Sequence, residues 1–271
     1  MQLKGARVLI TGAGSGIGRA LALDAVRRGM VVALCGRRSE ALKRTAALAQ
    51  SGTPPLIIAS DVTLADDRRR IVARLTEAWG GLEVLVNNAG VVEGGQLQTM
   101  LDAALERIVQ TNFVAPMALT RDLLALLSAS GAARIVNIGS VFGDIPYPGF
   151  AAYSASKFAL RGFSDAIRRE LAGSNIGVTY VAPRATQTDA AGAFEDLIAA
   201  TKMRLDLPER VARDVWRAIA KNKDCVYPPG PERIFVLIER LFPRLISWGL
   251  PRQQPSAIQL ISERQTLRSE G

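Results

Sequence analysis

The chain has 271 residues, 48% of them hydrophobic and 22% charged, and a formal net charge of +9 at pH 7. This length suits one large α/β domain or two small ones, with enough residues for a substantial buried core. Histidine is absent and only two cysteines occur, which excludes Ser-His-Asp and Cys-His catalysis, histidine-ligated zinc and a disulfide scaffold. We therefore expect no metal site.

Hydrophobic periodicity predicts strands that alternate with helices along most of the chain. Short apolar runs rich in β-branched residues predict strands over 7–11, 30–36, 56–60, 83–87, 134–138 and 177–181. Apolar residues at helical spacing predict helices over 17–28, 39–49, 64–79, 99–113, 116–128 and 153–172. Ser39 is the expected N-cap of the second helix. This alternation predicts a single doubly wound, Rossmann-type α/β domain over 1–228, a parallel sheet with helices on both faces.

Residues 229–271 are expected to form a C-terminal apolar helical extension, because Pro228-Pro229-Gly230-Pro231 interrupts the pattern. Within 231–250, one helical face collects apolar residues: Ile234, Leu237, Ile238, Leu241, Leu245 and Trp248. Pro243 should break or kink this helix. Three alternatives stay open for the apolar face. It packs on the domain's own core, forms a dimer interface or closes a neighbour's pocket, or lies on an anionic membrane.

A glycine-rich turn follows the first predicted strand and contains Gly12, Gly14, Gly16 and Gly18. Glycines allow a tight turn and a close approach of backbone N–H groups to a phosphate, and the helix that follows adds its positive N-terminal end. The spacing G-x-x-x-G-x-G departs from the usual dinucleotide fingerprint. Taken alone, the segment also fits a purely structural turn.

The second predicted strand ends in Cys35-Gly36-Arg37-Arg38. Dinucleotide-binding folds carry an acid here for the ribose 2′-hydroxyl of NAD, or an arginine for the 2′-phosphate of NADP. This chain has no carboxylate at that place, and two guanidiniums can clamp a phosphate in bidentate geometry. We predict NADP(H), with a solvated start to the next helix as the alternative reading of the arginines.

Further polar residues fall at or near the ends of later strands, where open α/β sheets bind ligands. Together with the glycine-rich turn, they resemble the classical short-chain dehydrogenase/reductase family from residue 4 to about residue 220. The motifs that match are T-G-x-x-x-G-x-G at 11–18, N-N-A-G at 87–90 and Y-x-x-x-K at 153–157, with Ser140 upstream. Each residue alone has a structural explanation, whereas the ordered set does not.

The resemblance implies a catalytic tetrad, matched here by Asn112, Ser140, Tyr153 and Lys157. It also implies cofactor contacts from the strand ends and the turns that follow them. The predicted cofactor-binding residues are Gly12, Ser15, Gly16, Ile17, Gly18, Arg37, Arg38, Asp61, Val62, Asn88, Ala89, Gly90, Tyr153, Lys157, Pro183, Thr186 and Thr188.

The predicted chemistry is the reduction of a ketone, which needs a hydride at carbon and a proton at oxygen. Tyr153 is the expected acid, although an unperturbed phenol has a pKa of about 10. Lys157 lies one helical turn further on, and we expect its ammonium, with the charge of the oxidised cofactor, to lower the pKa of Tyr153. Ser140 is expected to hydrogen-bond the substrate oxygen. Asn112 is expected to position a water that passes protons to Lys157.

Two features depart from the family pattern. Arg184 stands where the family usually has glycine, and it either touches an acidic or carbonyl-rich substrate or pairs with Asp189 or Glu195. The C-terminal helix replaces a short glycine-rich close, so we expect a homodimer, with the family's tetramer as the alternative. The small, apolar segment 188–207 is expected to form a mobile lid over a hydrophobic substrate.

Together these features predict NADPH-dependent reduction of a hydrophobic ketone, with lipid-derived and acyl-derived ketones among the candidates. The alternatives are NADP⁺-dependent alcohol oxidation and a cofactor-binding scaffold or sensor with little activity. No nucleic-acid partner is expected, because the arginines are scattered and no basic cluster is interleaved with aromatic residues. Cysteine usage and the absence of a signal peptide or a bilayer-length apolar run predict a cytoplasmic location, with peripheral membrane contact through 231–250 as the further alternative.

Overall fold

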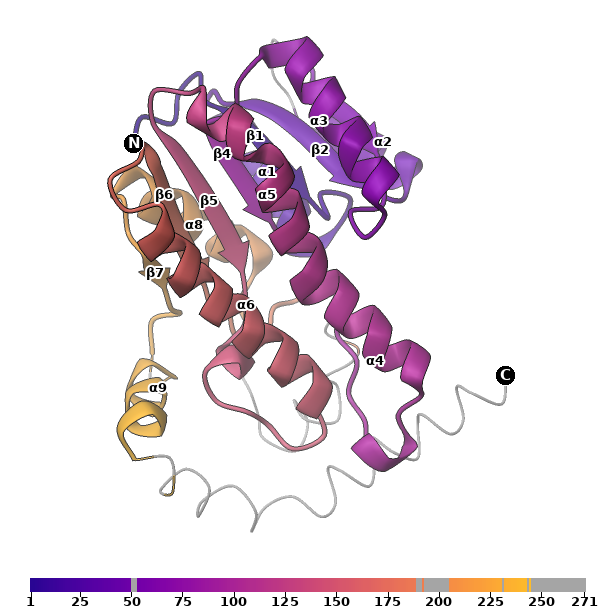
Figure 1. Ribbon diagram of the computed structural model, residues 1–271, viewed down its shortest axis with the longest axis vertical. Helices are drawn as coiled ribbons and strands as arrows, with labels where there is room; N and C mark the ends of the chain where they lie inside the picture. The colour runs from indigo at the N-terminus through magenta and orange to yellow at the C-terminus, as the bar shows by residue number, and fades with distance from the viewer. Residues whose placement is uncertain (50–52, 189–191, 193–204, 231, 243, 245–271) are drawn as a thin grey trace.

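A computed structural model of the chain describes residues 1–49, 53–188, 192, 205–230, 232–242 and 244 (Figure 1). In this part of the chain, seven parallel strands form one sheet of order β3-β2-β1-β4-β5-β6-β7. The winding direction reverses between β1 and β4, the switch point at which such sheets bind ligands. The strands are β1 (Arg7–Thr11), β2 (Val31–Gly36), β3 (Leu56–Ala59), β4 (Val84–Asn87), β5 (Ala133–Ile138), β6 (Ile176–Val181) and β7 (Cys225–Val226).

Helices cover both faces of the sheet (Figure 1). One face is covered by α1 and α8, which pack on each other, and the other by α3, α5 and α6. The α-helices are α1 (Gly16–Arg27), α2 (Ser39–Leu48), α3 (Ala65–Trp79), α4 (Asp102–Val109), α5 (Ala115–Ser128), α6 (Ala151–Glu170), α8 (Pro208–Ala220) and α9 (Glu232–Leu241). Short turns of other helix types are η1 (Leu97–Thr99), η2 (Gln110–Val114) and η3 (Val141–Gly143).

The core has two halves, one on each face of the sheet. Val8 and Ile10 of β1 belong to the half under α1 and α8, and Leu9 belongs to the half under α3 and α5, because successive strand side chains point to opposite faces. Both faces are covered, so the strands read as continuous apolar runs. The fully buried Trp216 anchors α8, and its indole N–H donates to the Leu21 carbonyl of α1 at 3.1 Å.

The predicted doubly wound parallel fold is confirmed, and the predicted strands and helices recur with small shifts of their ends. Ser39 is not the N-cap of α2: it is the first helical residue, and Arg38 precedes it without a side-chain cap bond. The helix predicted over 99–113 is divided, because α4 ends at Val109 and continues as the π-helical turn Gln110–Val114. The sequence analysis assigned neither α8 nor the two-residue strand β7.

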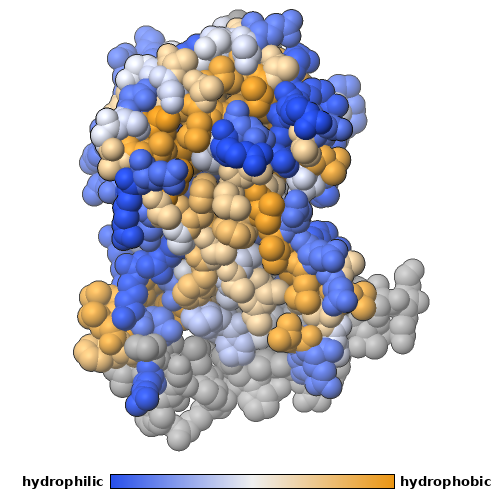
Figure 2. All heavy atoms as spheres, in the orientation of Figure 1, coloured by the Kyte–Doolittle hydropathy of each residue, from blue (hydrophilic) through white to orange (hydrophobic). Residues whose placement is uncertain are grey.

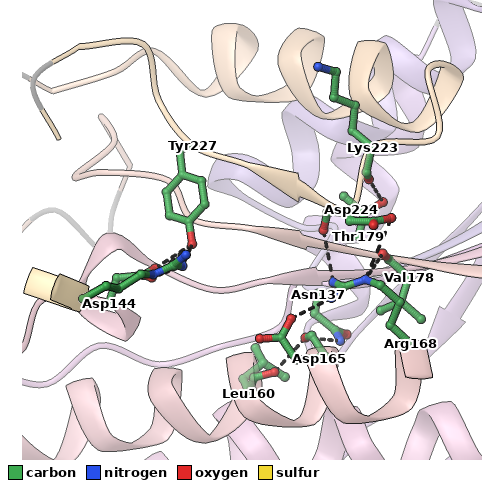
Figure 3. A network of polar contacts seen from close by, with 12 residues as sticks. Asn137, Asp144, Leu160, Asp165, Arg168, Val178, Thr179, Lys223, Asp224 and Tyr227 are labelled. Atoms are coloured by element: carbon green, nitrogen blue, oxygen red, sulfur yellow. Dashed lines mark hydrogen bonds and ion pairs between the residues drawn. The ribbon is translucent and has the colours of Figure 1, made fainter. Parts of the chain in front are cut away.

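Side-chain contacts hold the short strand β7 beside β6. The Thr179 hydroxyl donates to the Lys223 carbonyl at 2.7 Å. Arg168 of α6 donates to the Val178 and Asp224 carbonyls, both at 3.2 Å (Figure 3). These contacts fix the point at which the chain enters β7, the last strand before α9.

Helix α9 lies near the edge at which the strands end (Figure 1), and it keeps most of its apolar side chains exposed. Four of them are 47–62% exposed: Ile234, Phe235, Leu237 and Leu241. Val236 is the buried residue of this helix. The alternative in which the face packs on the domain's own core is therefore wrong for the described residues. Outside these residues lie Pro243, Leu245, Trp248 and most of the expected lid. Among the helices that the structure describes, none has the length and apolar character needed to cross a bilayer.

Candidate active site

A cleft of about 320 Å³ opens at the carboxyl ends of the strands and collects the predicted cofactor-binding residues. All of those residues except Gly18 line it, and so does Ser140. The sequence analysis missed part of the lining: Ala41, Leu42, Ser60, Val91, Val92, Ile138 and Gly139. Ser60, Ile138 and Gly139 could have been inferred from their places at strand ends. The approach of α2 to the cleft had no signal in the sequence.

The glycine-rich turn between β1 and α1 leaves no room for side chains. Gly12 has a φ of +67° and Gly16 a φ of +53°, which is the left-handed region that favours glycine. A Cβ on Gly18 would lie 2.2 Å from the Gly12 carbonyl oxygen, so Gly18 serves close packing behind the cleft. The N-terminus of α1 borders the cleft at Ser15, Gly16 and Ile17, and a helix N-terminus at this place fits the diphosphate of a dinucleotide.

Asn88 supports this turn from the end of β4. Its side-chain amide donates to the Thr11 carbonyl at 2.9 Å and to the Gly12 carbonyl at 3.4 Å. The backbone N–H groups of Asn88 and Ala89 both donate to the Thr11 hydroxyl at 2.9 Å. Asn88 and Thr11 therefore fix the two strand ends between which the switch point opens. Thr11 was not among the predicted site residues.

Arg37 follows β2 with a guanidinium that is largely free. Its side chain is 70% exposed, and its Nη1 lies 4.0 Å from Asp61 Oδ2. Ion pairs this exposed contribute little to stability. The Asp61 carboxylate is instead held by Thr63, whose backbone N–H and hydroxyl donate to it at 3.0 and 2.7 Å. Because Arg37 and Arg38 both line the cleft, their charges are available to a phosphate there.

Tyr153 and Lys157 lie one turn apart on α6, and both are buried. The Lys157 Nζ donates to the Ile138 carbonyl at 3.0 Å and lies 5.7 Å from the centre of the Tyr153 ring. Ser140 follows β5, and its hydroxyl accepts from the Phe142 N–H at 3.1 Å. The end of β5 and the start of α6 thus bring the predicted serine, tyrosine and lysine to one wall of the cleft.

Burial dominates the electrostatics of this wall. It raises the pKa of Tyr153 to about 12, against the smaller opposite effect of a hydrogen bond with the Ser140 side chain. Burial also lowers the pKa of Lys157 to about 8. The expected lowering of the tyrosine pKa is therefore not found in the protein alone. The phenolate loses solvation, and the ammonium that should offset this loss is bonded to the Ile138 carbonyl. Tyr153 is protonated at neutral pH in this state.

Asn112 sits in the π-helical turn behind the cleft. Its carbonyl oxygen accepts from the Val91 N–H at 2.8 Å, and its amide donates to the Val91 carbonyl at 2.9 Å and to the Ser156 hydroxyl at 3.1 Å. A Cβ on Gly90 would lie 3.1 Å from Asn112 Oδ1 and 3.6 Å from Lys157 Nζ, so Asn112 is near the lysine. Its side chain thus holds the segment after β4, and the water that Asn112 is expected to position stays a prediction.

Arg184 pairs with acids that were not predicted as its partners. Its Nε and Nη2 donate to the two Asp206 carboxylate oxygens at 2.9 and 2.8 Å, and its Nη1 donates to Glu232 at 2.7 Å. These contacts raise the pKa of Arg184. The predicted alternative partners, Asp189 and Glu195, lie outside the described residues. Among the described residues, Asp206 and Glu232 compensate the charge of Arg184.

Comparisons with known proteins agree with this geometry. The short chain dehydrogenase family model matches residues 6–197. The chain is 34% identical to Dehydrogenase/reductase SDR family protein 7-like of Anopheles gambiae, covering 93% of this chain and 84% of that protein. A short chain dehydrogenase/reductase from Burkholderia phymatum in complex with NAD has a TM-score of 0.82 at 26% identity, covering 90% of this chain and 96% of that one. A short-chain dehydrogenase from Sphingobium yanoikuyae in complex with NADPH has a TM-score of 0.77 at 29% identity, covering 89% of this chain and 95% of that one.

The chain belongs to the short-chain dehydrogenase/reductase family. It is an oxidoreductase of the kind that acts on alcohol and carbonyl groups. The solved relatives include complexes with NAD and with NADPH, so the choice between the two rests on the residues of this chain.

Proposed function

We propose that the protein is an NADPH-dependent reductase that converts a hydrophobic ketone to a secondary alcohol, with Tyr153 as the proton donor. The observation that carries this proposal is the buried group of Ser140, Tyr153 and Lys157 on one wall of the cleft. A phenol with a raised pKa is protonated at neutral pH, as an acid for ketone reduction must be. Alcohol oxidation with NADP⁺ is the reverse reaction at the same residues and starts from the phenolate of Tyr153.

Each residue of the site has a separate task in this proposal. The turn at 12–16 would hold the diphosphate, and Arg37 and Arg38 the 2′-phosphate. The bound nicotinamide supplies the hydride. The hydroxyls of Ser140 and Tyr153 orient the carbonyl oxygen of the substrate, and the phenol gives up its proton to that oxygen. Lys157 stabilises the phenolate that is left, provided that its amine is protonated.

Apolar side chains next to Tyr153 support a hydrophobic substrate. Phe142, Phe150 and Tyr153 form a small cluster against which Val92 and Tyr147 pack. The rings of Phe142 and Tyr147 stack at 5.3 Å between centres. Of this cluster, Val92 and Tyr153 line the cleft, and an apolar lining favours an apolar group beside the reacting carbonyl.

The proposed activity is tested by following NADPH absorbance with a panel of ketones of increasing apolar size. We expect specific activity to rise from small, polar ketones to aliphatic and cyclic ketones that fill the cleft, because burial of apolar area contributes about 25 cal/mol per Å². NADPH binding without consumption across the whole panel would support the scaffold alternative instead.

We also propose that residues 229–271 act as an extension to the domain of residues 1–228, and that the exposed face of α9 rests on an anionic membrane surface. The exposed charged residues near this face are basic: Arg233 and Arg244, together with Arg240, which is paired with Asp144. The acids of the helix, Glu232 and Glu239, are only partly exposed. Figure 2 displays apolar surface over α9 at the lower left, beside hydrophilic surface. Exposed apolar and basic side chains together are the pattern of interfacial helices. For the oligomeric state we propose a homodimer.

Vesicle flotation tests the membrane contact. We expect the protein to float with phosphatidylserine-containing vesicles, less so at high salt, and not with phosphatidylcholine vesicles alone. Phe235→Ser combined with Leu237→Ser should remove most of the binding, whereas Leu48→Ser should not, although Leu48 is an equally exposed leucine on α2. Light scattering of the same variants separates the alternatives: a double variant that becomes monomeric without any change in flotation would assign this face to a second copy.

A further inference from the structure

Asp144 is a buried carboxylate that joins three distant segments close to Ser140. It follows η3, the turn that begins directly after the serine. Arg161 of α6 lies 2.6 Å from its Oδ1, and Arg240 of α9 lies 2.8 Å from the same oxygen. The Tyr227 hydroxyl donates to Asp144 at 3.0 Å (Figure 3). The side chain of Asp144 has no exposed surface, whereas those of Arg161 and Arg240 are 22% and 43% exposed, so the carboxylate end of each pair is shielded from water.

The second loop at the cleft, after β6, is held by Arg184 in a similar way. Asp206 and Glu232 enclose the Arg184 guanidinium, which is only 11% exposed. Backbone hydrogen bonds also tie Asp206 to the loop after β6. The Asp206 N–H donates to the Ala185 carbonyl at 3.0 Å, and the Gln187 N–H donates to the Asp206 carbonyl at 2.9 Å. The loop thus depends on a residue at the beginning of α9.

We propose that α9 positions the active site through these two ion pairs. Glu232, at its first turn, holds the loop after β6 through Arg184, and Arg240, at its last turn, holds the loop after β5 through Asp144. All four are positioning residues, because they act through the loops that carry Ser140 and Pro183. The expected effect on turnover rests on the proposed reductase function, whereas the holding of the two loops by these ion pairs does not.

Two physical arguments support this role. Apolar packing does little to fix α9, because Val236 is its buried residue. Ion pairs to a buried group depend strongly on geometry. Without Arg240, Asp144 keeps Arg161 and Tyr227, and without the charge of Glu232, Arg184 keeps Asp206, so each change removes the contact that comes from α9. The two loops are also joined directly, since the Val141 N–H donates to the Pro183 carbonyl at 3.1 Å. A displacement at either pair would therefore reach both loops.

Hydrogen exchange of the full chain tests the structural part. We expect Arg240→Met to speed amide exchange over residues 141–145 by at least ~10-fold, and Glu232→Gln to do the same over 185–187 and at Asp206, because both variants lower the cost of local opening. Arg213→Met is the matched control. It removes the same charge from an exposed position on α8 and should leave both segments unchanged. Unchanged exchange in all three variants would overturn the proposal.

Kinetics test the consequence for the reaction. We expect Arg240→Met to lower kcat by about 10-fold or more, because small misplacements of reacting groups are costly, with the Kd for NADPH within twofold. Arg240→Lys should recover a large part of kcat. If the wild type is active and the folded Arg240→Met protein has the same kcat, the positioning role is overturned. A wild type without any ketone turnover would contradict the proposed function instead, and hydrogen exchange would still decide on the ion pairs.

Discussion

Replacement of Tyr153 by phenylalanine is expected to lower turnover by at least ~10²-fold, the usual scale for a general acid. The change removes one hydroxyl from a buried wall of the cleft and leaves the aromatic ring in place. Most of the predicted cofactor-binding residues lie elsewhere, so the affinity for NADPH should stay within a few-fold. Single-turnover measurements with excess enzyme, together with calorimetric titration of NADPH, measure the two quantities separately.

Lys157→Ala provides the contrast. Lys157 is also a predicted cofactor-binding residue and lines the cleft, so both turnover and NADPH affinity should fall. The variant also removes the bond to the Ile138 carbonyl, and its fold should be checked by circular dichroism. A Tyr153→Phe protein with nearly full activity on a ketone that the wild type reduces would show that another group supplies the proton.

The second large effect concerns cofactor choice. We expect the wild type to prefer NADPH over NADH by ~2–4 kcal/mol, because charge-assisted hydrogen bonds each contribute ~1.5–3 kcal/mol. Gly36→Asp combined with Arg37→Ala should weaken or reverse this preference. The new side chain fits, since a Cβ on Gly36 would meet Leu42 Cδ2 at an ordinary 3.5 Å. Calorimetric titration of both cofactors into both proteins gives the result.

Arg44→Ala is the matched control for this experiment. Arg44 is an exposed arginine on the same helix, α2, and it does not line the cleft. Loss of the Arg44 side chain should leave the difference in binding free energy between NADPH and NADH unchanged. Equal affinity of the wild-type protein for NADPH and NADH would contradict the assignment of Arg37 and Arg38 to the 2′-phosphate.

Sequence patterns predicted the fold and most of the cleft for a definite physical reason. A buried parallel strand is an apolar run, and its carboxyl end is where the chain must turn, so Gly12, Asp61 and Asn88 could be placed at one edge of the sheet from the sequence alone. Helix α8 had a comparable signal. Val211, Val215 and Trp216, all buried, have helical spacing, but this segment was not assigned.

The ionic contacts around the cleft could not be predicted in the same way. Arg184 pairs with Asp206 and Glu232, which are 22 and 48 residues away in the chain, and no local pattern links residues so far apart. The pKa of Tyr153 depends on how completely the folded protein removes the phenol from water. Periodicity also predicted the apolar face of α9 correctly, but it does not indicate whether the core covers such a face.

The most direct test of the account follows the hydride and the proton donor together. Each ketone of the panel is incubated with the wild-type protein and NADPH that carries deuterium at the transferable position of the nicotinamide, and any product alcohol is analysed by mass spectrometry. We expect the deuterium on the carbinol carbon of the product from the wild type, and label transfer at least ~10²-fold slower with Tyr153→Phe. Tight binding of NADPH without transfer of the label to any ketone of the panel would contradict the account, because it would leave a cofactor-binding protein without the proposed reductase activity.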